Sequence, residues 1–501
     1  MVKKKIGLFF GAGAEIGYGL PAGGRFALDI FKMGKETDRD HFKELIARID
    51  PRSQIARQWL PEGYGSRSIY VFGKGNFEEI IASSLENQKD VILTYLDAFD
   101  KGVSRVINQI DGIDEDGVRR VFEESYHLRI GDFLYADRIQ LNQKLTSESA
   151  IFSSPFFSAF LYMLEKTANK EIHKIVLGIM ELLVGSLGEH LVNELNNELV
   201  KTDNTSLNVF NDLGSLFALN YGSLGNTGLE LALRESSVSL KEDVTVEELF
   251  VEIGTRLLED AYSQVLDYQG LIDSHFRYLY QPKVHWAKFT RIAVFLHSVQ
   301  RYIQAQIPEE IPNEGIYHDL RLSDRYTLAT IGTSNYTNLL DTLIAKELCP
   351  PKKIVHLNGY LNDCYDPYRN HIYSDDGNVD PSNQLTVPFL FTQSGIKPLT
   401  AVSMSERYVD YYRDLKRCQE IGVLGYGFNG DDGHINGIFR RLVDEDHKLL
   451  HLFHYGDNLP GRDLAEVYAE KLRLTQKENL IVHLIDDLRQ VQGQNWTTVF
   501  E

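Results

Sequence analysis

Cysteine is scarce in this sequence, with three cysteines among 501 residues. They are Cys349, Cys364 and Cys418, and no two of them form a C-x-x-C pair. A disulfide framework needs several pairs and a tetrahedral thiolate zinc site needs more ligands than this, so both are excluded. The composition indicates a protein of a reducing compartment, and we expect it to be cytoplasmic.

Basic residues are also in short supply, because 52 Lys and Arg stand against 71 Asp and Glu, a formal net charge of −19. Most of the surface would repel a phosphate backbone, so no direct nucleic-acid partner is expected. The most apolar helical stretch, residues 175–187, contains Glu181 and is too short to cross a bilayer, so no membrane partner is expected. Glycines from Gly11 to Gly24 cut the first apolar run too short for a signal peptide.

The length of 501 residues exceeds one ordinary core, so two or three domains are expected. Apolar residues recur at three- and four-residue spacing through much of residues 76–306, for example from Ile172 to Leu191 and from Ile292 to Ile303. This spacing is typical of amphipathic helices. No fixed-period repeat is present, so we expect an irregular helical domain.

The first apolar run, residues 6–10, leads directly into a glycine-rich turn. The turn reads Gly11-Ala12-Gly13-Ala14-Glu15, and Gly19-Leu20-Pro21 follows shortly after. A strand, a tight loop and a helix in this order bring backbone amides and a helix N-terminus against a phosphate. An ordinary strand-to-helix turn has the same pattern, so the other strand ends must decide between the two interpretations.

Short apolar strands return after residue 325 and alternate with helices. We expect strands at 327–331, 353–357, 421–425 and 448–454, helices at 408–419, 434–443 and 464–472, and a loop at 361–383. Such alternation predicts an α/β fold with a doubly wound, parallel (Rossmann-like) sheet. The predicted sheet domain is discontinuous, formed by residues 1–34 and 325–501, and residues 35–324 form a mainly helical insertion.

Polar residues and glycines stand where each predicted strand ends, which is where open parallel sheets bind ligands. They are Gly11 to Glu15, Thr333-Ser334-Asn335, His356 with Asn358, Gly425-Tyr426-Gly427, and His454-Tyr455-Gly456-Asp457. Structural roles are possible for several of them. Asn335 would also suit a helix cap, and His356 a hydrogen-bonded core position. Asp432 and His434 would also suit a helix start, and Tyr455 would stack on adenine or close the domain edge.

Taken together, these motifs resemble the sirtuin superfamily. They are G-A-G after the first strand, G-x-P, T-x-N, a strand ending in H-x-x-G, and G-Y-x-F followed by D-x-H-I. More narrowly, they are similar to sirtuin-like NAD-consuming effectors of bacterial anti-phage defence systems. The resemblance covers roughly residues 5–34 and 325–460.

The resemblance implies that Gly11, Ala12 and Gly13 hold the NAD pyrophosphate and that Asn335 lies beside the nicotinamide ribose. A residue within 356–359 would act as base on a ribose hydroxyl. The other residues that we expect at the nucleotide are Ala14, Glu15, Pro21, Thr333, Ser334, Gly425, Tyr426, Gly427, Asp432, His434 and Tyr455.

Three departures from the family pattern bear on activity. The zinc module of lysine-deacylating sirtuins is missing, so deacylation is disfavoured and no zinc is expected. Asn358 precedes Gly359 where the family has histidine, so either His356 reaches the site from two residues earlier, or Asn358 takes the catalytic position and the chain is slow or inactive. Thr337 stands where many relatives have Asp, and Glu15 where Ser is common. An acid beside a pyrophosphate is repulsive unless it points away or binds a ribose hydroxyl.

The function expected from the resemblance is an NAD glycohydrolase that yields nicotinamide and ADP-ribose and is held inactive until infection. The helical insertion would then form a homo-oligomer, or dock an accessory defence protein such as an ATPase or a nucleotide-sensing subunit. The alternative is a catalytically weak regulatory subunit of a defence complex that binds NAD or ADP-ribose.

Overall fold

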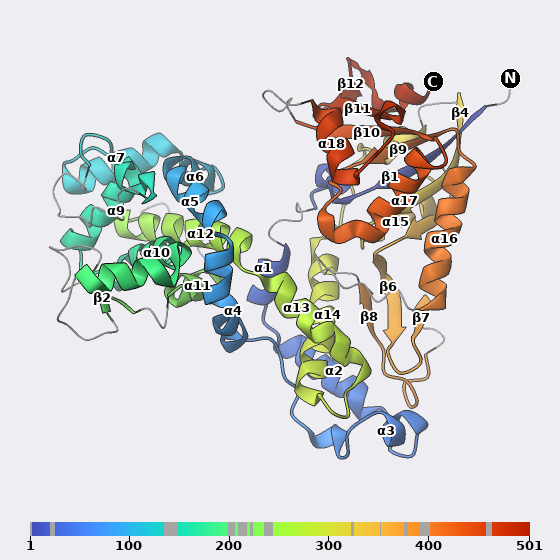
Figure 1. Ribbon diagram of the computed structural model, residues 1–501, viewed down its shortest axis with the longest axis horizontal. Coiled ribbons are helices and arrows are strands. Elements are labelled where there is room, and N and C mark those ends of the chain that lie inside the picture. The colour runs from blue at the N-terminus through green and yellow to red at the C-terminus, as the bar shows by residue number, and fades with distance from the viewer. Residues whose placement is uncertain are drawn as a thin grey trace. The chain divides into compact units, whose positions relative to one another are not determined.

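The computed structural model describes residues 3–20, 26–134, 148–198, 206–208, 218–220, 224–234, 244–321, 325–350, 352–374, 379–390, 401–456 and 463–501. The chain divides into two compact units, whose elements are drawn in Figure 1. The first unit comprises Met1–Phe26, Gly34–Val71 and Ile272–Glu501, and the second comprises Ala27–Met33 and Phe72–Leu271.

A six-stranded parallel sheet forms the centre of the first unit (Figure 1). In spatial order its strands are β11 (Leu480–Ile485), β10 (Leu449–Tyr455), β9 (Glu420–Leu424), β1 (Lys4–Phe10), β4 (Tyr326–Thr333) and β5 (Ile354–His356). The chain extends the sheet from β1 through β4 and β5, then continues on the other side of β1 through β9, β10 and β11. This is the strand order of the Rossmann fold, so the predicted α/β class with a parallel sheet is confirmed.

Strand β1 is buried on both faces, as the centre of a parallel sheet requires. Ile6, Leu8 and Phe10 pack into the core on one face, with residues of α15 and the C-terminal Trp496. Phe9 packs into the core on the other face, with residues of α16, α17 and α18. Each fully buried side chain of this size stabilises the fold by about 1.5–3 kcal/mol. Helices therefore cover both faces of the sheet, and the two lysines that begin β1, Lys4 and Lys5, precede its buried part.

The α-helices of this unit are α2 (Glu36–Ala47), α3 (Gln54–Gln58), α14 (Trp286–Gln306), α15 (Leu339–Ala345), α16 (Val402–Lys416), α17 (Gly433–Asp444) and α18 (Leu464–Leu472). Its 3-10 helices are η1 (Ala12–Tyr18), η2 (Tyr64–Ser66), η6 (Arg277–Tyr280), η7 (His318–Arg321), η9 (Gly430–Asp432), η10 (Lys477–Asn479) and η11 (Trp496–Phe500), and β12 (Gln490–Val491) pairs with β13 (Gln494–Asn495). Helix α17 illustrates the amphipathic pattern, because Ile435, Ile438, Phe439 and Leu442 are its buried residues at three- and four-residue spacing.

The predicted loop at 361–383 is wrong in part, because residues 361–366 and 371–374 belong to a small antiparallel sheet. Its strands are β7 (His371–Ser374), β6 (Gly359–Asp366) and β8 (Val387–Leu390). Two of the acidic residues that suggested a loop, Asp363 and Asp366, are buried. Asp363 is 1% exposed and accepts a hydrogen bond from Arg407 of α16, with Nη2 3.0 Å from Oδ1. This long-range ion pair allows an acidic residue to be buried in a strand, which the local composition does not indicate.

Helix α14 packs against β8 of this small sheet, and both belong to the first unit (Figure 1). Gln300 Nε2 donates to the Leu361 carbonyl at 2.7 Å, and Arg301 Nε donates to Asp38 Oδ1 of α2 at 2.8 Å. Residues 34–71 and the described residues of 272–324 therefore belong with the sheet, although the sequence placed them in the insertion. Amphipathic periodicity identifies a helix but not the partner that covers its apolar face.

The second unit is mainly helical. It contains α1 (Phe26–Lys32), α4 (Lys74–Asn87), α5 (Lys89–Asp97), α6 (Phe99–Ile107), α7 (Glu115–Tyr126), η4 (Ala150–Ser153), α9 (Pro155–Lys166), α10 (Lys170–Glu198), α11 (Asn226–Ala232), α12 (Val246–Val265), and the strands β2 (Ser206–Asn208) and β3 (Ala218–Asn220). The remaining helix, α13 (Tyr268–Phe276), contains the last of the four points at which the chain passes from one unit to the other. Among the helices that the structure describes, none combines the length and the hydropathy needed to cross a membrane.

Candidate functional site

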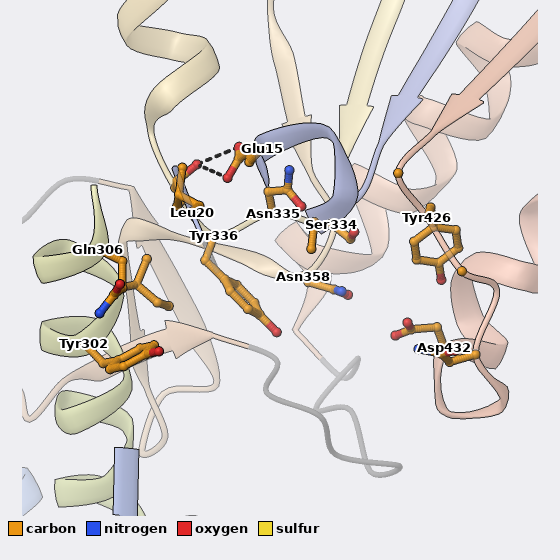
Figure 2. A pocket seen from close by; sticks show the side chains of 16 residues that line it. Glu15, Leu20, Tyr302, Gln306, Ser334, Asn335, Tyr336, Asn358, Tyr426 and Asp432 are labelled. Carbon is orange, nitrogen blue, oxygen red and sulfur yellow. Dashed lines mark hydrogen bonds between the residues drawn. The ribbon is translucent and has the colours of Figure 1, made fainter. Parts of the chain in front are cut away.

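A cavity of about 440 Å³ lies beyond the C-terminal ends of β1, β4, β5 and β9. The strand order reverses at this point, which is where open α/β sheets bind ligands. The cavity is lined by Ala12, Glu15, Leu20, Tyr302, Ile303, Gln306, Ser334, Asn335, Tyr336, Thr337, Asn358, Gly425, Tyr426, Gly427, Asn429 and Asp432. Figure 2 shows these side chains, with α14 on one side and the loop after β9 on the other.

A second cavity, of about 460 Å³, shares Gly425, Tyr426 and Gly427 with the first. It extends along the ends of β10 and β11, where it is lined by Phe453, His454, Tyr455, Tyr468, Ile485, Asp486, Asp487 and Arg489. Gly13, Ala14, Ile16, Gly17, Glu314, Gly315, Ile316 and Leu424 complete its wall. The loop after β9 therefore contributes to two adjacent cavities along the same edge of the sheet.

The glycines of the first turn allow the loop after β1 to pack closely against the loop after β9. The Gly11 amide donates to the Leu424 carbonyl and the Gly13 amide to the Gly425 carbonyl, both at 2.9 Å. A Cβ atom on Gly11 would lie 2.5 Å from the Gly425 carbonyl oxygen. Because these two amides donate to backbone carbonyls of the loop after β9, they do not point at a phosphate site. Ala12, between them, is exposed and lines the first cavity.

Asn335 is held in a fixed orientation at the end of β4. Its Nδ2 atom donates to the Gly11 carbonyl at 3.1 Å and lies 3.2 Å from the Tyr317 hydroxyl. Thr333 supports it, because its hydroxyl donates to the Phe10 carbonyl and accepts from the Asn335 amide, each at 2.9 Å. With both Nδ2 protons in use, Oδ1 is the atom of Asn335 that can accept a hydrogen bond from a ligand.

Glu15 is buried at the cavity wall, with 4% of its surface exposed. Its Oε1 atom accepts hydrogen bonds from the Tyr317 hydroxyl at 3.0 Å and from the Thr337 hydroxyl at 2.8 Å (Figure 2 draws the bond to Thr337). Burial raises the pKa of the Glu15 carboxyl above 4.5, and the hydrogen bonds from Thr337 and Tyr317 offset part of this rise. Thr337, the other departure from the family pattern, is thus the partner of Glu15.

The raised pKa of Glu15 makes stability depend on pH. A carboxyl whose pKa is higher in the folded chain than in the unfolded chain favours folding below pH 4.5, and this contribution is lost as pH rises through the folded value. Glu15→Gln is therefore expected to be more stable than wild type near pH 7, by about 0.5–2 kcal/mol. The advantage should shrink toward pH 4. Urea unfolding of both proteins at several pH values measures it, and a constant difference across this range would contradict the assignment.

His356 and Asn358 take different places, which the sequence could not decide. His356 Nε2 lies 3.0 Å from Asp341 Oδ2, and its Nδ1 lies 3.3 Å from the Asn335 carbonyl oxygen. Both ring nitrogens thus face acceptors, and His356 is not among the residues that line either cavity. Asn358 lines the first cavity, with its Oδ1 3.1 Å from His434 Nε2. The predicted two-residue alternation fails because β5 ends at His356 and Gly359 turns the chain at a φ of 86°.

Tyr426, in the loop after β9, and Asp432 of η9 line the first cavity on the side opposite α14 (Figure 2). The Tyr426 hydroxyl donates to Asn436 Oδ1 at 3.3 Å, and burial together with the nearby Asp432 carboxylate raises the pKa of the phenol. Burial and the charge of Asp432 also raise the pKa of Tyr336. All of these hydroxyls are therefore neutral at physiological pH.

The first cavity is acidic. Two carboxylates, Glu15 and Asp432, belong to its wall, and none of the described residues that line it is Lys or Arg. Such a wall repels a phosphate and attracts a cation. The second cavity includes Arg489, which is 2.9 Å from Asp319 Oδ2 through its Nε atom.

Most of the predicted site residues are brought together. The first cavity collects Ala12, Glu15, Ser334, Asn335, Asn358 and Asp432; the second collects Gly13, Ala14 and Tyr455; and Gly425, Tyr426 and Gly427 line both. The walls do not include Gly11, Thr333, His356 or His434, which instead support residues that do line them. Pro21 lies outside the described residues.

Sequence reasoning missed the wall formed by α14 and the support behind Glu15. Tyr302, Ile303 and Gln306 line the first cavity from α14, and Tyr317 reaches Glu15 from 302 residues away in the chain. The apolar periodicity at Tyr302 and Ile303 was visible, but it indicated only a helix. Nothing local to Tyr317 signals its role.

No family model matches this chain, and no curated protein sequence matches it. Over the described residues, no group of three or more His, Cys, Asp or Glu side chains is arranged to hold a metal ion.

Proposed function

We propose that this chain hydrolyses NAD to nicotinamide and ADP-ribose. The observation that carries the proposal is the acidic first cavity at the reversal of the strand order, which has Asn335 and Asn358 on its wall together with two carboxylates. The nicotinamide ring of NAD is a cation, and the ribose becomes cationic as the ring departs. A wall of carboxylates and amide oxygens favours both charges.

The substrate would span both cavities, with the reaction in the first. The nicotinamide ribose would lie in the first, where Asn335 Oδ1 can accept a hydrogen bond from a ribose hydroxyl or from the attacking water. The C1′–N1 bond breaks, its electron pair goes to the ring nitrogen, and neutral nicotinamide leaves. Water then adds to C1′ and loses a proton to solvent. Burial of Asn335, Asn358 and Glu15 keeps bulk water away from the cationic centre.

The rest of NAD would occupy the second cavity. Arg489 offers a positive charge to the pyrophosphate, and the exposed ring of Tyr455 offers a stacking surface to the adenine. Asp487, which accepts a hydrogen bond from the Tyr455 hydroxyl, could accept one from the adenosine ribose. Gly425–Gly427 would pass between the two halves of the substrate.

Nicotinamide release from NAD by the purified protein tests the proposal. We expect release by wild type and a decrease of about 100-fold in Asn335→Ala, because the variant loses the amide that faces the reacting ribose. The assay should cover protein concentrations that span the monomer and any oligomer, since the proposed effector is inactive until triggered.

Asn362→Ala is the matched control for this variant, because Asn362 is exposed on β6 and lines neither cavity. It should release nicotinamide at the wild-type rate. Thermal unfolding of Asn335→Ala shows whether the loss reflects folding. No release in any assembly state, or unchanged release in a folded Asn335→Ala, would refute the proposal.

A role in anti-phage defence belongs to the same proposal and is supported only by the resemblance of the motifs to such effectors. In that role the helical second unit would provide the surface for oligomerisation or for an accessory protein. A search for co-purifying proteins and the native mass of the assembly would test it.

A second candidate function is binding of NAD or ADP-ribose without cleavage. It is favoured by Asn358, which lines the cavity where a catalytic histidine was expected and which cannot act as a base at neutral pH. Calorimetric binding of NAD with no release of nicotinamide would distinguish this regulatory role from hydrolysis.

A further inference from the structure

Glu15 has unused hydrogen-bonding capacity at the wall of the first cavity. Its Oε1 atom accepts from the Tyr317 and Thr337 hydroxyls, and its Oε2 atom lies 2.9 Å from the same Thr337 hydroxyl. One hydroxyl carries one proton, whereas each carboxylate oxygen can accept about two hydrogen bonds. Oε2 therefore keeps capacity for at least one further donor, and the residue lines the cavity.

The other groups near the nicotinamide end are less suited to act on a ribose. His356 faces Asp341 and a carbonyl oxygen with its two nitrogens, outside the cavity wall. Asp432 lies near Tyr426 on the other side of the cavity from Glu15 (Figure 2). Asn335, fixed by Gly11 and Tyr317, adjoins Glu15 and brings an uncharged acceptor.

We propose that Glu15 is a catalytic residue for cleavage of NAD, accepting a hydrogen bond from a hydroxyl of the nicotinamide ribose and stabilising the positive charge that develops at C1′. This inference rests on the proposed function of the site. Glu15 thereby takes the place that the resemblance gave to a histidine. No proton transfer to Glu15 is required, because nicotinamide leaves with the bonding electron pair and the attacking water releases its proton to solvent.

Glu15 must be ionised for this role, which burial opposes by raising its pKa. The titratable groups that face it are Tyr317, whose pKa burial holds well above its ordinary value, and His356 of β5, whose charge favours the ionised carboxyl. Tyr18, stacked on Tyr317, also has a raised pKa. Neither phenol ionises in the physiological range, so neither contributes to an acid limb in the activity.

Steady-state cleavage of NAD across pH 4–9 tests this role in wild type and Glu15→Gln. We expect Glu15→Gln to lower kcat by about 100-fold with little change in KM, and to lose the acid limb of the kcat profile. Thr337→Val removes a hydrogen bond that lowers the pKa of Glu15, so its acid limb should move to higher pH. Glu445→Gln, at an exposed glutamate of α17's C-terminal end, is the control and should behave as wild type.

A binding measurement separates this inference from the proposed function. Calorimetry compares ADP-ribose with ADP, which lacks the terminal ribose. We expect wild type to prefer ADP-ribose by about tenfold or more, and Glu15→Gln to lose that preference while it keeps its affinity for ADP.

The outcomes are distinct. Cleavage by Glu15→Gln at the wild-type rate, or an unchanged preference for ADP-ribose, overturns the role of Glu15 and leaves the proposed function in place. No cleavage by wild type, with the preference still lost in Glu15→Gln, overturns hydrolysis and retains the ribose contact. A parallel shift of the acid limb in Thr337→Val supports the catalytic role, because a purely structural glutamate would leave the profile unmoved.

Discussion

Gly425→Ala is expected to destabilise the chain by about 3–5 kcal/mol and to deform both cavities. Gly425 has a φ of 67°, a region that residues with a side chain rarely adopt. A Cβ atom there would lie 2.1 Å from the Ala14 amide nitrogen and 2.6 Å from the Gly13 carbonyl carbon. These are backbone atoms of the facing loop, so no side-chain rotation relieves the clash. Urea unfolding measures the loss.

Gly427→Ala is the matched control, two residues further along the same loop. Its Cβ would meet nothing closer than Asn429 Oδ1 at 3.5 Å, so we expect its unfolding midpoint to stay close to that of wild type. Equal midpoints for the two alanine variants would mean that the loops after β1 and β9 do not approach as closely as described. The comparison also separates the packing role of the glycines from any role at a ligand.

The chemistry at the strand ends could be predicted because it is local. An apolar run followed by a glycine or polar residue marks the end of a buried strand, and parallel strands bring such ends to one edge. Asn335, Asn358, Tyr426 and Glu15 were identified in this way, and all line the first cavity. Five of the six strands of the parallel sheet are predicted from the same pattern, and β11 is the one that is missed.

The contacts that decide chemistry were not predictable, because they join distant parts of the chain. Glu15 meets Thr337 across 322 positions, and no pattern near Glu15 indicates a hydroxyl partner. Arg407 similarly neutralises Asp363 and converts a loop-like composition into a strand. Long-range pairs of this kind change what a residue does without changing the local signal.

The end of β5 at His356 explains why this residue does not line the cavity as expected. Same-face alternation holds only while the strand continues, and β5 ends at this residue. The positive φ of Gly359 then starts β6 in a new direction. Asn358 reaches the cavity as a result, and Glu15 rather than His356 is the group that we propose to act on the ribose.

Asp319→Ala is expected to destabilise the chain by about 3–5 kcal/mol. Asp319 is buried, and its Oδ2 atom accepts from Arg489 Nε at 2.9 Å and from Trp496 Nε1 at 3.1 Å. Trp496 is fully buried in the core under β1, so its N–H would lose its only described acceptor. Among the residues that the structure describes, Arg489 would keep Glu314, 3.7 Å away, as its ion-pair partner. Urea unfolding with tryptophan fluorescence measures the loss.

Asp319→Asn and Trp496→Phe divide this effect into charge and hydrogen bond. Asparagine keeps an acceptor oxygen and loses the charge, and phenylalanine keeps most of the ring and loses the donor, so each should cost less than Asp319→Ala. A double-mutant cycle between Asp319→Ala and Trp496→Phe should give a coupling of about 1 kcal/mol or more. Because Arg489 lines the second cavity, Asp319→Ala should also weaken ADP binding in the fraction that remains folded. Additive effects on stability would show that Asp319 and Trp496 stabilise the core independently, and would contradict the shared hydrogen bond.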